Sequence, residues 1–355
     1  MRILHPGFFS GCRGNQFPPG PKSVTVEIQD LQKQIPCFHP DTMLLQEEVT
    51  VRDLRNNLRV AVVQAEPALF DQKTCLEKAL KKIEECAENG AELVVFPELY
   101  IPGYPFGMNF GFATGCRNAP GREDWKRYYD NSLLSDGPEI GQLCDAAKKH
   151  GIYLSMGYSE RDRVTGTLYN SNVMIDPEGR RMNHRKLKPT GSERLVWGDA
   201  NRDYFPVMDT PWGPMGCLIC WESYMPLARV ALYEQGISLY ISANTNDNPE
   251  WQDTIRHIAI EGHCYFINAD LLITKASYPK DLNEIHALDD RPDILCRGGS
   301  CIIDPFGHLV SECIWDEEAV IYADLDMQKV PASKMEHDVC GHYARPDVLR
   351  FDFDR

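Results

Sequence analysis

Residues 215–224 of the 355-residue chain read MGCLICWESY, and this segment contains the local pattern on which the fold is built. The apolar run Met215–Ile219 is typical of a buried strand, Cys220 follows it directly, and a helix is expected over 224–235. A thiol between a strand end and a helix N-terminus faces oriented amides that lower its pKa. Cys220 is therefore a candidate nucleophile, whereas Cys217 within the strand is expected to lie in the core.

The same alternation of strand and helix runs along most of the chain. Short runs rich in Val, Ile and Leu predict further strands at 58–64, 92–96, 152–158, 168–175, 180–186, 237–242, 265–270, 300–303, 308–313 and 319–324. Apolar residues at helical spacing predict helices at 74–89, 139–150 and 251–263. The turn sequence DPEG at 176–179 predicts a hairpin. This mixed order indicates an α/β fold of layered sheets covered by helices.

The charge balance and the cysteine content narrow the possible partners and the cellular location. With 37 Lys and Arg against 52 Asp and Glu, the net charge of −15 disfavours binding to nucleic acid or to an anionic membrane surface. No apolar run approaches the roughly 20 residues that span a bilayer. The 13 cysteines show no disulfide spacing, and several lie in apolar runs, which indicates free thiols in a reducing, cytoplasmic setting.

Composition also divides the chain into three parts. Residues 1–57 are rich in Pro and Gly near their start and show little periodicity, so we expect an irregular N-terminal extension. The main domain is expected over 58–330 because the alternating strands and helices lie there. Residues 331–355 form a C-terminal tail, which we expect to take part in subunit contacts.

Two further segments place ionisable side chains where a predicted strand ends. Glu98 follows the run that ends in Phe96-Pro97, and α/β folds commonly form pockets at the carboxyl ends of their strands. Lys186 lies in HRKLKPT at 184–190, and strand alternation points it away from its neighbours. Alone, Glu98 fits a surface cap and Lys186 a solvated strand end. With Cys220 they form a set of base, cation and nucleophile.

In this order and context, Glu98, Lys186 and Cys220 resemble the Glu–Lys–Cys triad of the nitrilase superfamily of carbon–nitrogen hydrolases. The resemblance covers most of the chain. The chain is similar to the nitrilase branch of this superfamily in five segments. These are HRK (184–186), ERLVWG (193–198), CWE (220–222), MPLAR (225–229), and WQ (251–252) followed by HIA (257–259). Ser223 and Gly191 depart from residues that many nitrilases carry, and both departures bear on the choice of substrate.

The resemblance implies a four-layer α-β-β-α sandwich for the hydrolase domain. It implies a nitrilase that converts an organic nitrile to a carboxylic acid and ammonia through a thioimidate and a thioester. Cys220 would be the nucleophile, Glu98 the general base, and Lys186 the group that stabilises negative charge. Glu193 matches the family's second glutamate and would orient the lysine and relay protons.

The resemblance also suggests a substrate pocket and an assembly. Trp197, Trp221 and Glu222 are expected to line the pocket, although core packing is an equal alternative for the two tryptophans. Neither a metal nor an organic cofactor is expected. The small-molecule nitrile is the expected partner, together with further copies of the chain in a homodimer or a larger homo-oligomer such as a spiral.

Three other functions remain compatible with parts of the sequence. An amidase or a carbamoylase of the same superfamily would share the triad. A binding or regulatory protein on an inactive hydrolase scaffold would lack one or more of its polar residues, and all four are present. A zinc or redox protein could use Cys217 and Cys220, which are spaced as C-x-x-C, but a second such pair is missing.

Overall fold

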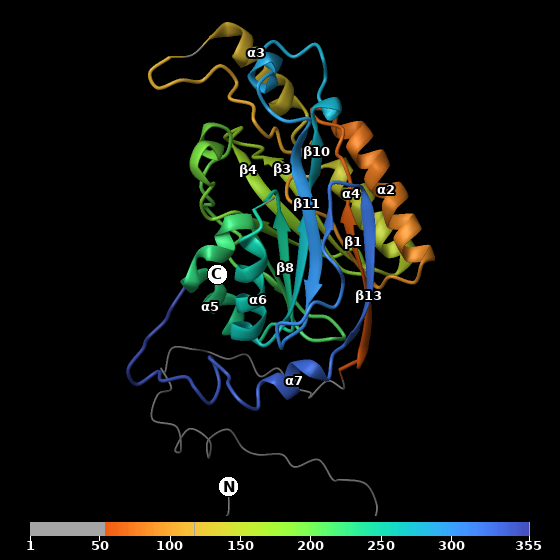
Figure 1. The fold of residues 1–355 in the computed structure, drawn as a ribbon, viewed down its shortest axis with the longest axis vertical. Coiled ribbons are helices and arrows are strands. Elements are labelled where there is room, and N and C mark those ends of the chain that lie inside the picture. The colour runs from red at the N-terminus through yellow and green to blue at the C-terminus, as the bar shows by residue number, and fades with distance from the viewer. Residues whose placement is uncertain (1–53, 117, 247, 355) are drawn as a thin grey trace, which may run out of the picture. The chain divides into compact units, whose positions relative to one another are not determined.

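The computed structural model describes residues 54–354, except residues 117 and 247 (Figure 1). Residues 1–53 of the irregular extension expected at 1–57 therefore lie outside the described residues. Within the described part of the chain, no helix has the length and apolar character required to cross a membrane.

Two mixed β-sheets form the centre of the described unit (Figure 1). The strands of the first sheet follow the order β13 (Ala319–Asp326), β1 (Asn57–Gln64), β2 (Leu93–Val95), β3 (Tyr153–Arg161), β4 (Leu168–Ile175) and β5 (Arg181–Arg185). The second sheet follows the order β10 (Leu272–Thr274), β11 (Ile294–Ile303), β9 (Tyr265–Asp270), β8 (Leu239–Asn244), β7 (Met215–Ile219) and β6 (Val207–Met208), with β12 (Ile314–Trp315) paired to β11. Parallel pairs lie inside each sheet, at β1–β2–β3 and β7–β8–β9, and antiparallel pairs lie at the edges.

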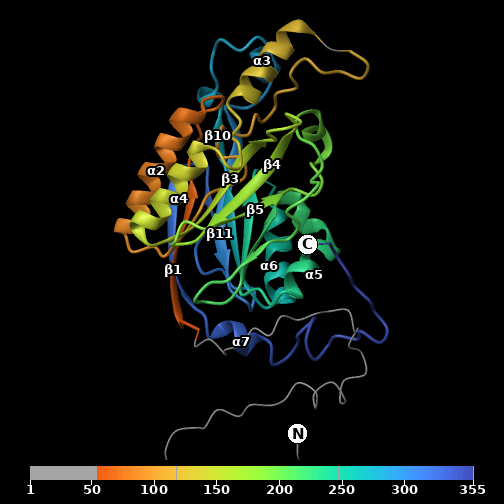
Figure 2. The same cartoon turned by 180° about the vertical axis from the view of Figure 1, so that it is seen from behind.

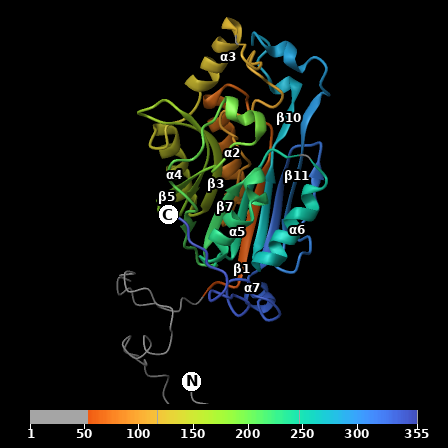
Figure 3. The ribbon, with the colours of Figure 1, turned by 90° about the vertical axis from the view of Figure 1, so that its left-hand side faces the viewer.

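Helices cover the outer faces of both sheets. The helices α2 (Gln72–Glu88) and α4 (Pro138–His150) lie side by side against the first sheet (Figures 1 and 2). The helices α5 (Pro226–Tyr233) and α6 (Trp251–Gly262) pack on the second sheet, and Figure 3 shows α4 and α6 on opposite sides of the strands. The expected α-β-β-α sandwich is therefore confirmed.

Strand alternation explains how each sheet buries both of its faces. Along β1, Ala61 and Val63 pack in the core beneath α2 and α4, whereas Val60 and Val62 pack in the core between the two sheets. Because both faces are covered, the strand is apolar at nearly every position. The continuous apolar runs of the sequence are the direct consequence.

The boundaries of several elements follow from their capping residues. The Asp71 side chain accepts a hydrogen bond of 3.0 Å from the Thr74 backbone N–H and begins α2. Helix α4 ends at Gly151, whose φ of 64° is the left-handed conformation that glycine adopts most easily. The hairpin predicted at 176–179 joins β4 to β5.

One expected strand was wrong, one expected helix begins later than predicted, and one helix was not predicted. Residues 308–313 form a turn with one isolated bridge, between Ile303 and Leu309, and the strand β12 begins only at Ile314. The helix expected over 224–235 corresponds to α5, which begins two residues later because Pro226 has no N–H to donate and suits the first turn of a helix; the 3-10 turn η2 (Cys220–Tyr224) precedes it. Helix α3 (Ala119–Asp130) was not predicted, although Asn118 caps it through a hydrogen bond from the Gly121 N–H.

The chain after α7 (Lys329–Ser333) returns toward α5 (Figure 1). The Phe351 and Phe353 side chains pack on the cluster formed by α5, α6 and the second sheet, and the Phe353 ring lies 5.6 Å from the ring of Phe205. The tail therefore contributes to the core of its own subunit, and its expected part in subunit contacts stays a prediction.

Candidate active site

Glu98 lies three residues after the end of β2, and its side chain is fully buried. One carboxylate oxygen, Oε1, accepts hydrogen bonds from Lys186 Nζ at 2.8 Å and from Asn170 Nδ2 at 2.6 Å. The other oxygen, Oε2, has no hydrogen-bond partner among the described residues. One oxygen is thus fixed in place, while the other remains able to accept a proton or bind water.

Lys186 directly follows β5 and lies between two carboxylates. Its Nζ donates to Glu98 Oε1 and, at 2.9 Å, to Glu193 Oε2. Burial opposes the charged amine, but the Glu98 and Glu193 carboxylates outweigh it and raise the pKa of Lys186. The lysine is therefore a permanent cation at neutral pH, not a base.

Glu193 is positioned by the 3-10 helix η1 (Gly191–Leu195). Its Oε2 also accepts a hydrogen bond from the Thr190 backbone N–H at 2.7 Å, which makes a capping box at the start of that helix. Its Oε1 accepts a hydrogen bond from the Tyr104 hydroxyl at 2.8 Å. These contacts hold the second carboxylate against Lys186.

Cys220 is the residue at which β7 ends and η2 begins, and it is buried. Its φ of 53° lies in the left-handed region, where a non-glycine side chain is strained, as is common for nucleophiles presented on a sharp turn. The Cys220 thiol is close enough to Glu98, Lys186 and Glu193 for all three charges to act on it. The structure thus brings together the four residues that the sequence predicted to be catalytic.

The expectation of a lowered thiol pKa was wrong. Burial, followed by the Glu98 charge, raises the pKa of Cys220 well above its ordinary value, although Lys186 and the Thr245 backbone act in the opposite direction. The 3-10 turn η2 is only five residues long, so it offers a small dipole compared with the cost of desolvation. The resting thiol consequently keeps its proton.

Glu222 connects the two segments that carry the lysine and the cysteine. Its Oε2 accepts hydrogen bonds of 2.8 Å from the Ile219 backbone N–H and from His184 Nε2. Its Oε1 accepts one of 2.8 Å from the Leu187 backbone N–H. Ile219 precedes Cys220, and the other two residues flank Lys186, so this buried carboxylate fixes the distance between nucleophile and cation.

His184 completes that connection from inside the core. Its Nδ1 lies 3.4 Å from the Asp203 carbonyl oxygen and its Nε2 faces Glu222, so both ring nitrogens face acceptors. Burial disfavours the charged ring, but Glu222 and then Asp203 outweigh it and raise the pKa of His184. Glu222 was predicted to line the substrate pocket; the geometry supports a positioning role for it.

The two predicted tryptophans differ in their surroundings. Trp197 is buried, donates from Nε1 to Ser159 Oγ at 3.1 Å, and has its ring 5.7 Å from that of Tyr104. Trp221 is 46% exposed and packs edge-on against Tyr224. Trp197 thus supports the tyrosine that holds the second glutamate, and pocket lining by either ring stays a prediction.

Sequence patterns missed three residues of the site. Asn170 on β4 and Tyr104 after β2 hold Glu98 and Glu193, and neither belongs to a local motif. Thr245 lies after β8, and its backbone interacts with the Cys220 thiol. Its buried hydroxyl, like Glu98 Oε2, has no hydrogen-bond partner among the described residues.

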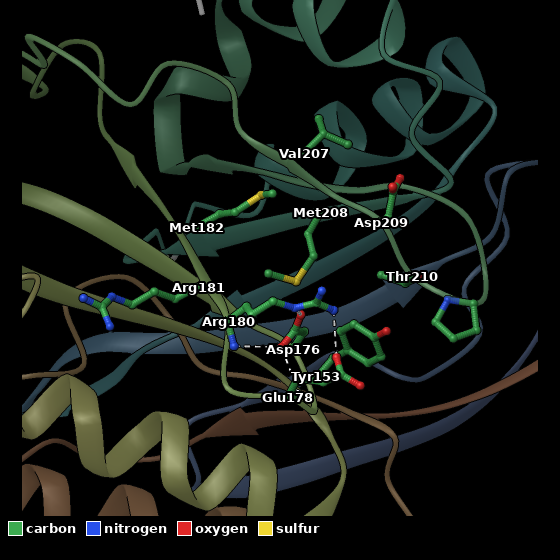
Figure 4. A pocket seen from close by; sticks show the side chains of 11 residues that line it. Tyr153, Asp176, Glu178, Arg180, Arg181, Met182, Val207, Met208, Asp209 and Thr210 are labelled. Atoms are coloured by element: carbon green, nitrogen blue, oxygen red, sulfur yellow. Dashed lines mark hydrogen bonds and ion pairs between the residues drawn. The ribbon is translucent and has the colours of Figure 1, made fainter. Parts of the chain in front are cut away.

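A separate pocket lies at the open edges of the two sheets, next to β5 and β6 (Figure 4). Its charged rim is held by Arg180, whose Nε donates to Asp176 at 2.6 Å and whose Nη2 donates to Glu178 at 2.9 Å. None of the predicted catalytic residues lines it. Among the residues that the structure describes, no group of three or more His, Cys, Asp and Glu is arranged to hold a metal ion.

Comparisons with known proteins agree with this geometry. The family model of carbon–nitrogen hydrolases matches residues 59–335. An aliphatic nitrilase of Sinorhizobium fredii is 42% identical over 83% of this chain and 95% of its own length. Nitrilase 2 of Arabidopsis thaliana is 41% identical over 82% of this chain and 87% of its own. A tobacco protein named bifunctional nitrilase/nitrile hydratase NIT4B is 40% identical over 82% and 84%.

Solved structures show the same fold at lower identity. The C. elegans NitFhit protein superposes with a TM-score of 0.64 at 21% identity, over 83% of this chain and 67% of that one. Saccharomyces cerevisiae Nit3, described as a member of the nitrilase superfamily, superposes with a TM-score of 0.64 at 19% identity, over 82% and 98%. Together with the family match and the identities above, these likenesses show that the chain belongs to the carbon–nitrogen hydrolase family and, within it, to the nitrilase branch.

Proposed function

We propose that the chain hydrolyses an organic nitrile to the carboxylic acid and ammonia through a covalent intermediate on Cys220. The observation that carries the proposal is the buried chain of hydrogen bonds from Glu98 through Lys186 to Glu193, whose charges act on the Cys220 thiol. Relatives named nitrilases, at 41–42% identity, support a nitrile as the substrate class.

In the first step, the Cys220 thiol passes its proton to Glu98 while the sulfur attacks the nitrile carbon. Because burial raises the pKa of the thiol, proton transfer has to accompany the attack. Burial also raises the pKa of Glu98, which makes it a stronger base than an exposed carboxylate. Negative charge then develops on the nitrile nitrogen, where the buried Lys186 ammonium can stabilise it.

Two water molecules complete the cycle. The first adds to the thioimidate carbon, ammonia leaves, and an acyl thioester remains. The second releases the carboxylic acid and restores the thiol. Glu98 can activate both waters through its unpartnered Oε2. Glu193 holds Lys186 from the other side and keeps the ammonium oriented during both steps.

Release of an amide is the second candidate outcome. The name of the tobacco relative includes a nitrile hydratase activity, whose product is the amide. After the first water has added, the tetrahedral intermediate can expel either ammonia or the thiolate, and expulsion of the thiolate releases an amide. An amidase or a carbamoylase would use the same triad on an amide substrate.

The test is a panel of aliphatic, arylaceto-, aromatic and cyano-amino-acid nitriles, with acid, amide and ammonia measured separately, beside a matched panel of amides. We expect turnover of nitriles with acid as the main product. Cys220→Ala should abolish turnover and leave the fold intact, whereas Cys116→Ala, which removes an exposed thiol, should leave the rate unchanged. Retained activity in Cys220→Ala, or turnover of amides alone, would overturn the proposal.

The assembly and the location are proposals of the same kind. We infer at least a homodimer, because η2 and α5 expose the large apolar side chains of Trp221, Tyr224, Met225 and Leu227. Light scattering on a size-exclusion column would test it, and a monomer would contradict it. We also infer a hydrolase domain over 58–330 and a cytoplasmic location, which the free thiols of all eleven described cysteines support.

A further inference from the structure

A second pair of cysteines, Cys301 and Cys313, lies far from the proposed nucleophile in the sequence, on β11 and just before β12. These two strands pair in antiparallel fashion, with Ser300 opposite Ile314. Cys301 follows the first of these residues and Cys313 precedes the second, so the two cysteines lie next to this pair of residues on neighbouring segments.

The side chains of the two cysteines converge on a single atom. The Cys301 and Cys313 sulfur atoms each lie 3.3 Å from Gln252 Oε1, close enough for either thiol to donate to it, and the two thiols are also within hydrogen-bonding reach of each other. Gln252 is the second residue of α6, and its Nε2 donates to the Gly299 carbonyl oxygen at 3.1 Å. The amide is thereby held in place, and its oxygen gathers both sulfur atoms on one side of β11.

The two thiols are unequal in access and in acidity. Cys313 is half-buried, whereas Cys301 is fully buried. The hydrogen bond from Cys301, assisted by the Arg256 charge and opposed by burial, lowers the pKa of Cys313 to about 7. Cys313 is therefore the more readily ionised of the two thiols. The proposed nucleophile Cys220 has a raised pKa and is expected to react with oxidants more slowly.

We propose that Cys301 and Cys313 are an oxidisable dithiol that closes to an intramolecular disulfide when the protein meets a peroxide. In this pair, Cys313 is the residue that reacts with the oxidant and Cys301 is the residue that resolves the product. The pair reacts before Cys220 does, so the first equivalent of oxidant is consumed away from the proposed catalytic centre.

The chemistry balances with hydrogen peroxide as the oxidant. The Cys313 thiolate attacks one peroxide oxygen; an S–O bond forms, the O–O bond breaks, and hydroxide leaves and takes up a proton as water. The sulfur of the resulting sulfenic acid is oxidised by two electrons. Cys301 then attacks that sulfur, loses its proton to the departing hydroxide, and a second water leaves as the S–S bond forms. Two thiols and one peroxide give one disulfide and two waters.

The experiment is oxidation of the full-length wild-type protein with one equivalent of hydrogen peroxide at pH 7. Remaining thiols are blocked with N-ethylmaleimide, the protein is digested without reductant, and its peptides are identified by mass spectrometry. We expect a Cys301–Cys313 disulfide as the first oxidation product, reversed by dithiothreitol. Cys220 should still be fully alkylated in the denatured digest at this dose.

Two variants separate the roles of the partners. In Cys301→Ser the resolving thiol is missing, so dimedone should trap a sulfenic acid at Cys313 that the wild type does not accumulate. Cys116→Ser, which removes an exposed thiol outside the pair, should leave the yield of disulfide unchanged. Identification of the disulfide-linked peptides of the wild type tests the proposal even if Cys301→Ser fails to fold.

Three results would overturn the proposal: oxidation of Cys220 or Cys116 before the pair, a disulfide between Cys313 and any other cysteine, or conversion of Cys313 to sulfinic acid while Cys301 remains alkylatable. Because every readout is a peptide mass, a failure of nitrile turnover leaves this test unaffected.

Discussion

Replacing Glu222 by alanine removes the acceptor of three buried hydrogen bonds, from Ile219, Leu187 and His184. The cost comes from these donors, which would stay buried without their acceptor. Each unsatisfied buried donor costs about 1–3 kcal/mol. That loss is a substantial part of the roughly 5–15 kcal/mol by which natural domains are stable. We therefore expect Glu222→Ala to fold poorly or not at all.

Glu222→Gln provides the measurable case. The glutamine oxygen can still accept hydrogen bonds from Ile219 and His184. Its NH₂ group would then face the Leu187 N–H, and two donors cannot form a hydrogen bond with each other. One unsatisfied buried donor costs about 1–3 kcal/mol, and this is the expected loss in the free energy of unfolding. The rate should fall as well, because Leu187 follows Lys186 directly and moves with it.

Urea denaturation followed by circular dichroism, with kcat for the preferred nitrile, would measure both effects. The control is Glu84→Gln, which weakens the exposed pair with Lys149 and should leave the urea midpoint unchanged. A Glu222→Gln variant with wild-type stability and wild-type kcat would refute the positioning role. A variant in which only KM changes would also refute it, because that result would support the expectation that Glu222 lines the substrate pocket.

Four other changes test separate parts of the structure. Gly157→Ala would place its Cβ 2.8 Å from the Glu98 Cα and should cost about 1–3 kcal/mol in urea unfolding and lower kcat. Gly141→Ala, in α4 with no atom within 4 Å of the new Cβ, should stabilise by about 0.5–1 kcal/mol. Tyr104→Phe removes only the hydroxyl that holds the second glutamate, so kcat should fall while the urea midpoint changes little; an unchanged kcat would exclude that role. The raised pKa of His184 means that its charge stabilises the fold fully below about pH 6.5 and loses this effect as pH rises through the folded pKa. The stability difference between wild type and His184→Gln should therefore shrink toward alkaline pH, and a difference that grows would contradict the assignment.

Most of the strands could be predicted because both faces of each sheet are covered. β4, β7 and β9 have the bounds that their apolar runs indicate. The predictions of secondary structure failed where a proline or a turn interrupts a segment whose apolar spacing suggests a continuous helix or strand. Pro226 starts α5 two residues later than the helical spacing indicates, and 308–313 alternates like a strand but makes only one isolated bridge. Helix α3 carries few apolar residues, so its period was not visible.

The candidate reactive side chains could be singled out only as a set, because each alone also fits a structural role. Glu98, Lys186 and Cys220 each follow a strand, and the structure places them in one buried cluster. The cysteine pair at 301 and 313 gave no such signal, because its spacing is unremarkable until β11 and β12 pair. Cross-strand contacts depend on register, which a single short strand does not specify.

Protonation states and supporting contacts required the folded arrangement. Cys220 lies before a helical turn, which suggests a lowered pKa, yet burial among the two glutamates raises it. Glu98 and Lys186 are 88 positions apart, and Asn170 reaches Glu98 across 72. Local sequence thus specifies which side chains can react, because strand ends are visible in it. Which of them holds a proton depends on desolvation and on charges that become neighbours only when the two sheets have formed.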